Sequence, residues 1–98
     1  MERTEIVLEG RKGEIQLFSD DQKAGKMDIS VIGKKLTVYH TEVNPEFEGK
    51  GFGKILLGRL VSYARENDLK IVPLCLFVHA QFKRHPEEYN DVWLREGM

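Results

Sequence analysis

The sequence predicts a mixed α/β fold, in which three antiparallel strands precede a strand–helix–strand unit and a short C-terminal helical tail. Three observations lead to this prediction. Alternating apolar residues mark the first third of the chain, an apolar stripe at helical spacing runs through residues 51–66, and a further apolar segment covers residues 70–78. Strands joined through a helix are expected to be parallel, with a right-handed crossover, so the sheet should contain both orientations.

Short turns separate the N-terminal strands. Alternation predicts strands at residues 4–9, 14–19 and 26–32, and a run rich in β-branched residues predicts a fourth at residues 36–43. Glycine and aspartate between these segments favour tight turns, which make neighbouring strands antiparallel. Pro45 ends the fourth strand, because proline cannot continue a hydrogen-bonded ladder.

The second half of the chain begins with the helix expected at residues 51–66, for which Asn67 is a suitable end. Residues 70–78 are typical of a strand that is buried on both faces. Residues 82–93 predict a helical tail that begins near Pro86, since proline followed by two glutamates suits a first helical turn.

The composition limits the classes of function. Ninety-eight residues suit one domain spanning residues 1–98, and a net charge of −1 gives no attraction to nucleic acid or anionic membranes. The N-terminus has no apolar signal core and the chain has one cysteine, which together indicate a cytoplasmic protein. We expect no metal site, because Cys75 stands alone and the histidines lack zinc-finger spacing. The sequence shows no exposed apolar stripe of the kind that would indicate a strong dimer. We therefore expect a monomer or a weak homodimer.

A glycine-rich turn between the fourth strand and the helix is the most informative motif. Residues 48–54 are Glu-Gly-Lys-Gly-Phe-Gly-Lys. Backbone N–H groups at a helix N-terminus attract anions, and glycine allows a ligand to approach closely. The motif therefore predicts a phosphate or pyrophosphate site. Its spacing fits neither a P-loop nor a dinucleotide fingerprint, and a surface turn without a ligand is the alternative.

Pro73 provides a second clue, because it lies inside the predicted fifth strand and lacks a ladder N–H group. It is tolerated if this strand diverges from the fourth, and such a gap leaves backbone groups that an extended amide-containing ligand could satisfy. A pyrophosphate at the glycine turn and an amide-bearing arm in the gap together describe coenzyme A. An edge strand or a bulge at Pro73 is an equally good interpretation.

With these features the chain resembles the GNAT superfamily of N-acetyltransferases. The superfamily's core motif, Gln or Arg followed by x-x-Gly-x-Gly/Ala, corresponds to residues 48–53, although Glu48 replaces Gln or Arg. Residues 40–43, 71–75 and 85–89 suggest the small YjdJ-type branch. The resemblance covers residues 40–93 and implies a GNAT-like mixed sheet with splayed fourth and fifth strands. It also implies acetyl-CoA as the donor and an amine as the acceptor.

The resemblance also implies which residues contact coenzyme A. The pyrophosphate would be held by the backbone amides of the turn, namely Gly49, Lys50, Gly51, Phe52, Gly53 and Lys54. The backbone of Thr41 and Val43 would pair with the pantetheine arm. Lys83 or Arg84 would contact the phosphates, unless they form only a solvated surface cluster. The superfamily places helices between its first two strands. Here only residues 10–13 occupy that place, so the groove should be open to a protein amine, a polyamine or a small amine.

Acetyl transfer requires a neutral amine, a polarised thioester carbonyl and a thiolate that can leave. The N–H of Val43 is the candidate for polarising the carbonyl. Cys75 is the candidate nucleophile or proton donor, although many buried cysteines serve only as small apolar residues. A shared strand face with Leu36 and Val38 would turn His40 toward Cys75, as its partner or as the base.

Two further residues have candidate roles. Glu42 is a second possible base, and Tyr89 is a possible acid that could instead pack on Trp93 one helical turn away. The sequence thus predicts an acetyl-CoA-dependent N-acetyltransferase that acts through Cys75 or with its assistance. A non-catalytic module that binds CoA or acyl-CoA is the alternative.

Overall fold

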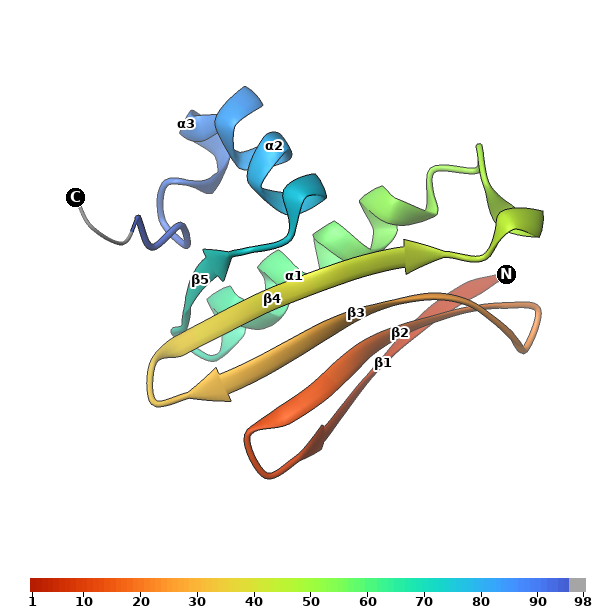
Figure 1. Cartoon of the computed structure of the whole chain (residues 1–98), viewed down its shortest axis with the longest axis horizontal. Coiled ribbons are helices and arrows are strands. Elements are labelled where there is room, and N and C mark those ends of the chain that lie inside the picture. Colours follow the sequence, from red (N-terminus) through yellow and green to blue (C-terminus); the bar gives the residue numbers. More distant parts are fainter. Residues whose placement is uncertain (96–98) are drawn as a thin grey trace.

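The computed structural model describes residues 1–95 and contains one five-stranded mixed sheet in the order β1-β2-β3-β4-β5. The first four strands are antiparallel neighbours, and β5 pairs in parallel with β4 (Figure 1). The predicted mixed α/β fold is therefore confirmed. The strands are β1 (Glu2–Glu9), β2 (Lys12–Ser19), β3 (Gln22–Ile32), β4 (Lys35–Val43) and β5 (Lys70–Pro73).

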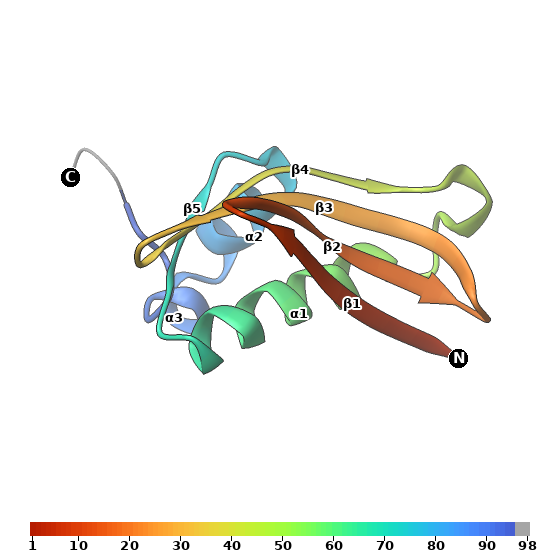
Figure 2. The same cartoon turned by 90° about the horizontal axis from the view of Figure 1, so that it is seen from below.

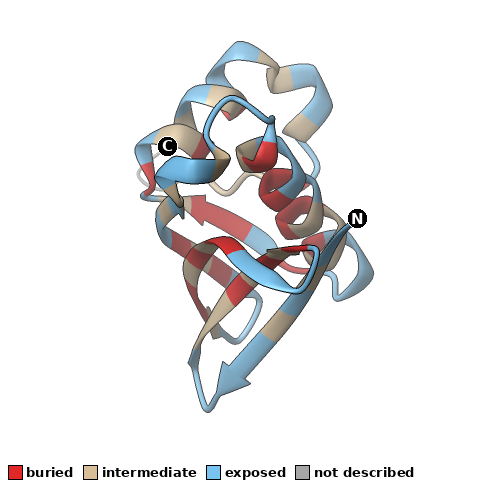
Figure 3. Ribbon diagram, turned by 90° about the vertical axis from the view of Figure 1, so that its right-hand side faces the viewer, coloured by how far each residue is buried: buried red, intermediate tan, exposed pale blue. Residues whose placement is uncertain are grey.

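The long helix α1 (Phe52–Glu66) connects β4 to β5 and lies along one face of the sheet (Figure 2). A 3₁₀ turn, η1 (Pro45–Phe47), comes before it. Buried positions, red in Figure 3, occur on α1 and on the strands that it covers. On the strand side these are alternate residues of the central strands, and on the helix side they follow helical spacing. They include Ile15, Leu17, Met27, Ile29, Leu36, Val38, Leu56, Leu60 and Ala64.

The fifth strand is shorter than the sequence predicted. It ends at Pro73 rather than at residue 78, because the N–H groups of Leu74 and Cys75 both turn to the carbonyl of Val38, at 3.1 and 3.0 Å. The chain then enters α2 (Leu76–Arg84). The short apolar run in this segment did not distinguish a strand from a helix, whereas burial of Val78 and Phe82, four residues apart, follows the helical period.

The C-terminal part returns to the sheet. The short helix α3 (Pro86–Tyr89) begins at the predicted proline. Beyond it, Ile71 donates to Val92 and accepts from Leu94, at 2.6 and 2.9 Å, so this segment runs along the free edge of β5. None of the helices within residues 1–95 has the length and apolar character needed to cross a lipid bilayer.

Candidate functional site

The glycine turn forms the N-terminus of α1 with its amides available. Gly49 and Gly51 have φ of +81° and +77°, a conformation that favours glycine, and Gly51 is the N-cap. In the described part of the chain, the N–H groups of residues 49–53 donate to no backbone carbonyl, and no side chain caps the helix. The N–H of Lys54 is different, since it donates to Gly51 at 3.2 Å. The available set therefore ends at Gly53, one residue earlier than predicted.

Contacts with β3, with Phe47 and with α2 hold the turn in place. Asn44 donates its side-chain Nδ2 to the carbonyl of Lys23 at 2.7 Å, which ties the start of the turn to β3. Phe52 is buried and its ring stacks on Phe47 with centroids 5.7 Å apart. A Cβ at Gly53 would lie 3.2 Å from the ring of Phe77, so this glycine lets α1 and α2 meet closely. A Cβ at Gly51 would meet nothing within 4 Å, which leaves room for a ligand over the amides.

A gap follows where β5 stops and β4 continues (Figure 1). The last parallel partners are Val38 and Pro73, so residues 39–43 of β4 have no partner from β5. On the other side of β4, the N–H of Asn44 donates to Ala24 on the β3 side at 2.8 Å. Backbone groups alternate in direction along an antiparallel pair, so those of Thr41 and Val43 point away from β3 and into the gap. This orientation suits the predicted pairing with a pantetheine arm.

A bulge at Tyr39 changes which residues share a face of β4. The register shifts from Ile29–Val38 to Asp28–His40, which leaves Tyr39 as the extra residue. Leu36 and Val38 are buried toward α1 before the bulge, whereas Thr41 occupies that side after it. The prediction that His40 shares a face with Leu36 and Val38 was therefore wrong. His40 and Glu42 are both exposed on the opposite face of the sheet, away from Cys75.

Cys75 lies at the junction between β5 and α2. It is the N-cap of α2, which corrects the prediction that it lies within a strand over residues 70–78. Its side chain is 5% exposed, and Sγ lies 3.2 Å from the hydroxyl of Thr41. A thioester within reach of this thiol would therefore lie beside Thr41, so the N–H of Thr41 is better placed than that of Val43 to polarise a carbonyl.

The remaining predicted residues lie elsewhere. Lys83 and Arg84 are exposed in the last turn of α2, whereas its first turn lies beside the gap. Tyr89 stacks on Phe82 with ring centroids 4.7 Å apart. The nearby carbonyl of Glu88 accepts a hydrogen bond from Arg65 at the end of α1, 2.9 Å away. Since α1 has 15 residues, Tyr89 is separated from the glycine turn by about 20 Å of helix.

Within the part of the chain that the structure describes, no three His, Cys, Asp or Glu side chains gather in a way that could hold a metal ion. The groups found along the gap are backbone amides, one thiol and one hydroxyl. Sequence reasoning missed Tyr39 and Phe77. Pairing between strands, which shows the bulge, and contact between helices, which shows Phe77, are both absent from a linear pattern.

The structure thus combines amides without backbone partners at a helix N-terminus with a gap between two parallel strands, the two features from which an anionic ligand with an extended amide arm was predicted. The sequence profile of the GCN5-related N-acetyl-transferase family matches residues 14–92. The chain therefore belongs to the GCN5-related N-acetyltransferase family. Among proteins with curated descriptions, none matches it.

Solved structures agree with the family. A GCN5-like protein from Staphylococcus aureus is 31% identical with a TM-score of 0.64, and the match covers 92% of this chain and 87% of that one. The ribosomal-protein alanine N-acetyltransferase of Escherichia coli is 19% identical with a TM-score of 0.63, over 67% of this chain and 43% of that one. The PaiA N-acetyltransferase of Thermoplasma acidophilum, solved with coenzyme A, is 16% identical with a TM-score of 0.60, over 80% and 50%. This chain thus spans less than half of the Escherichia coli enzyme, and the two more distant likenesses concern the fold.

Proposed function

We propose that this chain is an acetyl-CoA-dependent N-acetyltransferase of the small YjdJ-type branch, which moves an acetyl group to an amine. The observation that carries the proposal is the continuity of three features. The free amides of the glycine turn, the unpaired edge of β4 at Thr41 and Val43, and the thiol of Cys75 follow one another along the gap. Bound acetyl-CoA would supply the thioester that donates the acetyl group.

The residues that hold the cosubstrate act mainly through their backbone. The N–H groups of residues 49–53 lie at the positive end of α1, where an anion is stabilised by about 0.3–1 kcal/mol. Lys50 and Lys54 are exposed beside these amides and add positive charge. Glu48 is also exposed. Its contact within the turn is made by its backbone N–H, which donates to the carbonyl of Pro45 at 3.2 Å.

In the proposed transfer, the neutral amine attacks the thioester carbonyl, and the N–H of Thr41 donates a hydrogen bond to its oxygen. The new C–N bond forms as the C–S bond breaks. The departing sulfur takes the proton of the Cys75 thiol, and the amine gives its own proton to His40 or Glu42 on the exposed face. The negative charge left on Cys75 is stabilised by the N-terminus of the nine-residue helix α2 and by the Thr41 hydroxyl.

The surroundings of Cys75 support the role of proton donor over that of nucleophile. A nucleophilic thiol needs a base beside it. Among residues 1–95 the recorded side-chain partner of Sγ is the hydroxyl of Thr41, and His40 is exposed on the other face. A proton donor needs only contact with the departing sulfur and a means of stabilising the charge that it acquires.

The first test is a thermal-shift titration with coenzyme A and acetyl-CoA. A ligand at 100 times its Kd adds about 2.7 kcal/mol to the free energy of unfolding, which a small domain shows clearly as a raised Tm. Free coenzyme A should then appear when an amine is supplied. If acetyl-CoA binds but no amine causes free coenzyme A to be formed from it, the chain is instead a non-catalytic module.

The second test separates the two roles of Cys75. We expect Cys75→Ala to lower kcat at least tenfold while coenzyme A still raises the Tm, because the contacts of residues 49–53 are untouched. The intact protein incubated with acetyl-CoA alone should gain no acetyl group on Cys75 by mass spectrometry. An acetylated Cys75 would show a covalent route, and full turnover of Cys75→Ala would remove both roles.

A further inference from the structure

The face of the sheet that points away from α1, here called the open face, carries charged side chains in register. Lys12 on β2 is the partner of Ser30 on β3, whose hydroxyl lies 2.7 Å from that of Tyr39 on β4. Two residues along, Glu14, Asp28 and His40 form the next row across the same three strands. A row with a cation therefore lies beside a row with two carboxylates, and both rows end on β4.

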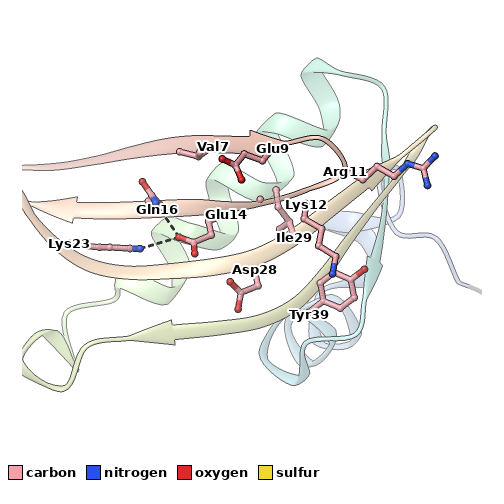
Figure 4. A pocket seen from close by; sticks show the side chains of 11 residues that line it. Val7, Glu9, Arg11, Lys12, Glu14, Gln16, Lys23, Asp28, Ile29 and Tyr39 are labelled. Atoms are coloured by element: carbon pink, nitrogen blue, oxygen red, sulfur yellow. Dashed lines mark hydrogen bonds and ion pairs between the residues drawn. The ribbon is translucent and has the colours of Figure 1, made fainter.

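From these rows, Lys12, Glu14, Asp28 and Tyr39 line a cavity of about 880 Å³ (Figure 4), whereas Ser30 and His40 do not line it. Figure 4 shows side chains from all four antiparallel strands around it, with Lys12 and Tyr39 on the same side. The cavity is bounded by Tyr39, which is also the bulge residue where β4 loses its partner β5. Tyr39 is thus the residue of β4 that lies both at the cavity and at the start of the gap.

The charges in the cavity differ in how far they are already neutralised. Glu14 accepts from Gln16 at 3.1 Å and from Lys23 at 3.0 Å, and these contacts hold its pKa below the ordinary value. Oδ1 of Asp28 accepts a hydrogen bond from Lys26 at 3.1 Å, whereas Oδ2 of Asp28 has no partner within residues 1–95. Lys12, which also lines the cavity, has no ion pair within residues 1–95. The groups in the cavity without an ion pair among residues 1–95 are therefore Oδ2 of Asp28, the ammonium of Lys12 and the exposed side chains of Glu9 and Arg11, and of these Asp28 lies on the strand next to β4.

An acceptor can reach the gap from this face. On the other face, Thr41 contacts Cys75 and Phe77 lies beside Gly53, so these side chains occupy that side of the gap. On the open face His40 is exposed and Tyr39 is 46% exposed. Neighbouring strands lie about 5 Å apart, so Asp28 is one strand from the edge of the gap.

We infer that the open-face cavity binds the head group of an α,ω-diamino acid such as lysine, whose terminal amine is the acetyl acceptor. This inference rests on the proposed N-acetyltransferase function. The α-ammonium group binds Asp28, the α-carboxylate binds Lys12, and the side chain extends past His40 into the gap. An extended lysine side chain spans about 6 Å, which matches the distance from the β3 row to the edge of β4.

A matched pair of acceptors tests the inference. L-lysine and 1,5-diaminopentane have the same chain length and the same terminal amine, but the diamine lacks the carboxylate. We expect L-lysine to have the lower KM by about fivefold, because one partly exposed charge pair is worth about 1 kcal/mol. Lys12→Gln should raise the KM for L-lysine about fivefold and leave that for the diamine unchanged. Asp28→Asn should raise both.

The control is Lys34→Gln, which removes an exposed lysine from the turn between β3 and β4, where its partner is the exposed Asp68 at 3.8 Å. It should change neither KM. As a readout without turnover, L-lysine added to the protein saturated with coenzyme A should shift the amide NMR signals of Ser30 and Tyr39, and Lys12→Gln should weaken this response.

The outcomes separate this inference from the function on which it rests. If coenzyme A fails to raise the Tm, both are wrong. If coenzyme A binds and amines are acetylated, but L-lysine and the diamine have equal KM values and Lys12→Gln alters neither, only the inference is overturned. Acetylation of Nα-acetyl-lysine amide, which lacks both head-group charges, as efficiently as L-lysine would overturn it too.

Discussion

The two ends of the helix layer differ in how completely their polar groups are satisfied. At the open end, which comprises the N-termini of α1 and α2 with Gly51 and Cys75, backbone amides are available and β4 has an unpaired edge. At the closed end, where both helices finish, Arg65 forms two hydrogen bonds to Asp91 and one to the carbonyl of Glu88. The same two helices therefore begin at the proposed binding site and end in a stabilising cluster.

The closed end also contains the aromatic residues. Phe82 is fully buried, stacks on Tyr89 and contacts Trp93 with ring centroids 5.6 Å apart. Aromatic contacts of this kind add about 0.5–1.5 kcal/mol beyond the burial of their area. Polar groups can remain unpaired at the open end because packing at the closed end holds the helices in place.

The largest expected effect concerns the closed end. Phe82→Ala should lower the free energy of unfolding by about 3–5 kcal/mol, because it leaves a cavity in the core. Ile55→Ala, at a position that is 36% exposed on α1, should cost far less. Urea unfolding followed by circular dichroism measures both. Equal losses in the two variants would mean that the closed end does not stabilise the fold in this way.

The second effect concerns the open end. Gly51→Ala should cost about 1–2 kcal/mol of stability because φ is +77°, and Gly33→Ala should cost about the same at φ +60° in a turn between strands. Neither new Cβ meets protein atoms. Only Gly51→Ala should weaken the binding of coenzyme A, with a Kd at least tenfold higher, since its Cβ fills the space over the amides. Equal Kd values for the two variants in calorimetry would argue against a phosphate site at this turn.

A smaller effect should depend on pH. The Arg65 guanidinium holds the pKa of Asp91 below its usual value, so the pair stabilises the protein above the unfolded-state pKa of about 3.9. This contribution is lost as the pH falls through the folded-state pKa. Asp91 is more than half exposed, so Asp91→Asn should cost less than about 1 kcal/mol at pH 7. The difference from the unmodified protein should vanish in urea titrations at strongly acidic pH, and a difference that persists there would exclude the ion pair as its cause.

The smallest expected effect is on turnover. Burial, together with a hydrogen bond involving Glu88, raises the pKa of Tyr89 above its ordinary value, and its ring is packed on Phe82. Tyr89→Phe keeps this ring, so we expect kcat to be unchanged in the acetyl-transfer assay. A tenfold lower kcat at unchanged Tm would return Tyr89 to the role of general acid.

Much of the fold followed from local patterns. Turn residues separated the first four strands, the apolar stripe predicted α1 within one residue, and Pro86 marked the start of α3. Pro73, which lacks a ladder N–H group, left two interpretations open, a strand that diverges from its neighbour or an edge strand with a bulge, and the pairing of β5 with β4 ends at this residue. The run after Pro73 was assigned to the wrong element, because a short apolar segment suits either a buried strand or a helix.

The sequence by itself determined the glycine turn, its place between strand and helix, and a break in the ladder at Pro73, although it predicted that the strand continues to residue 78. These depend on the chemistry of single residues: the positive φ that glycine accepts and the N–H group that proline lacks. The tertiary structure alone decided the faces. A bulge at Tyr39 turned His40 away from Cys75, and the fold brought Thr41 to the thiol across 34 residues of chain. Alternation along one strand cannot reveal such a shift, because the extra residue is defined only by its missing partner on the neighbouring strand.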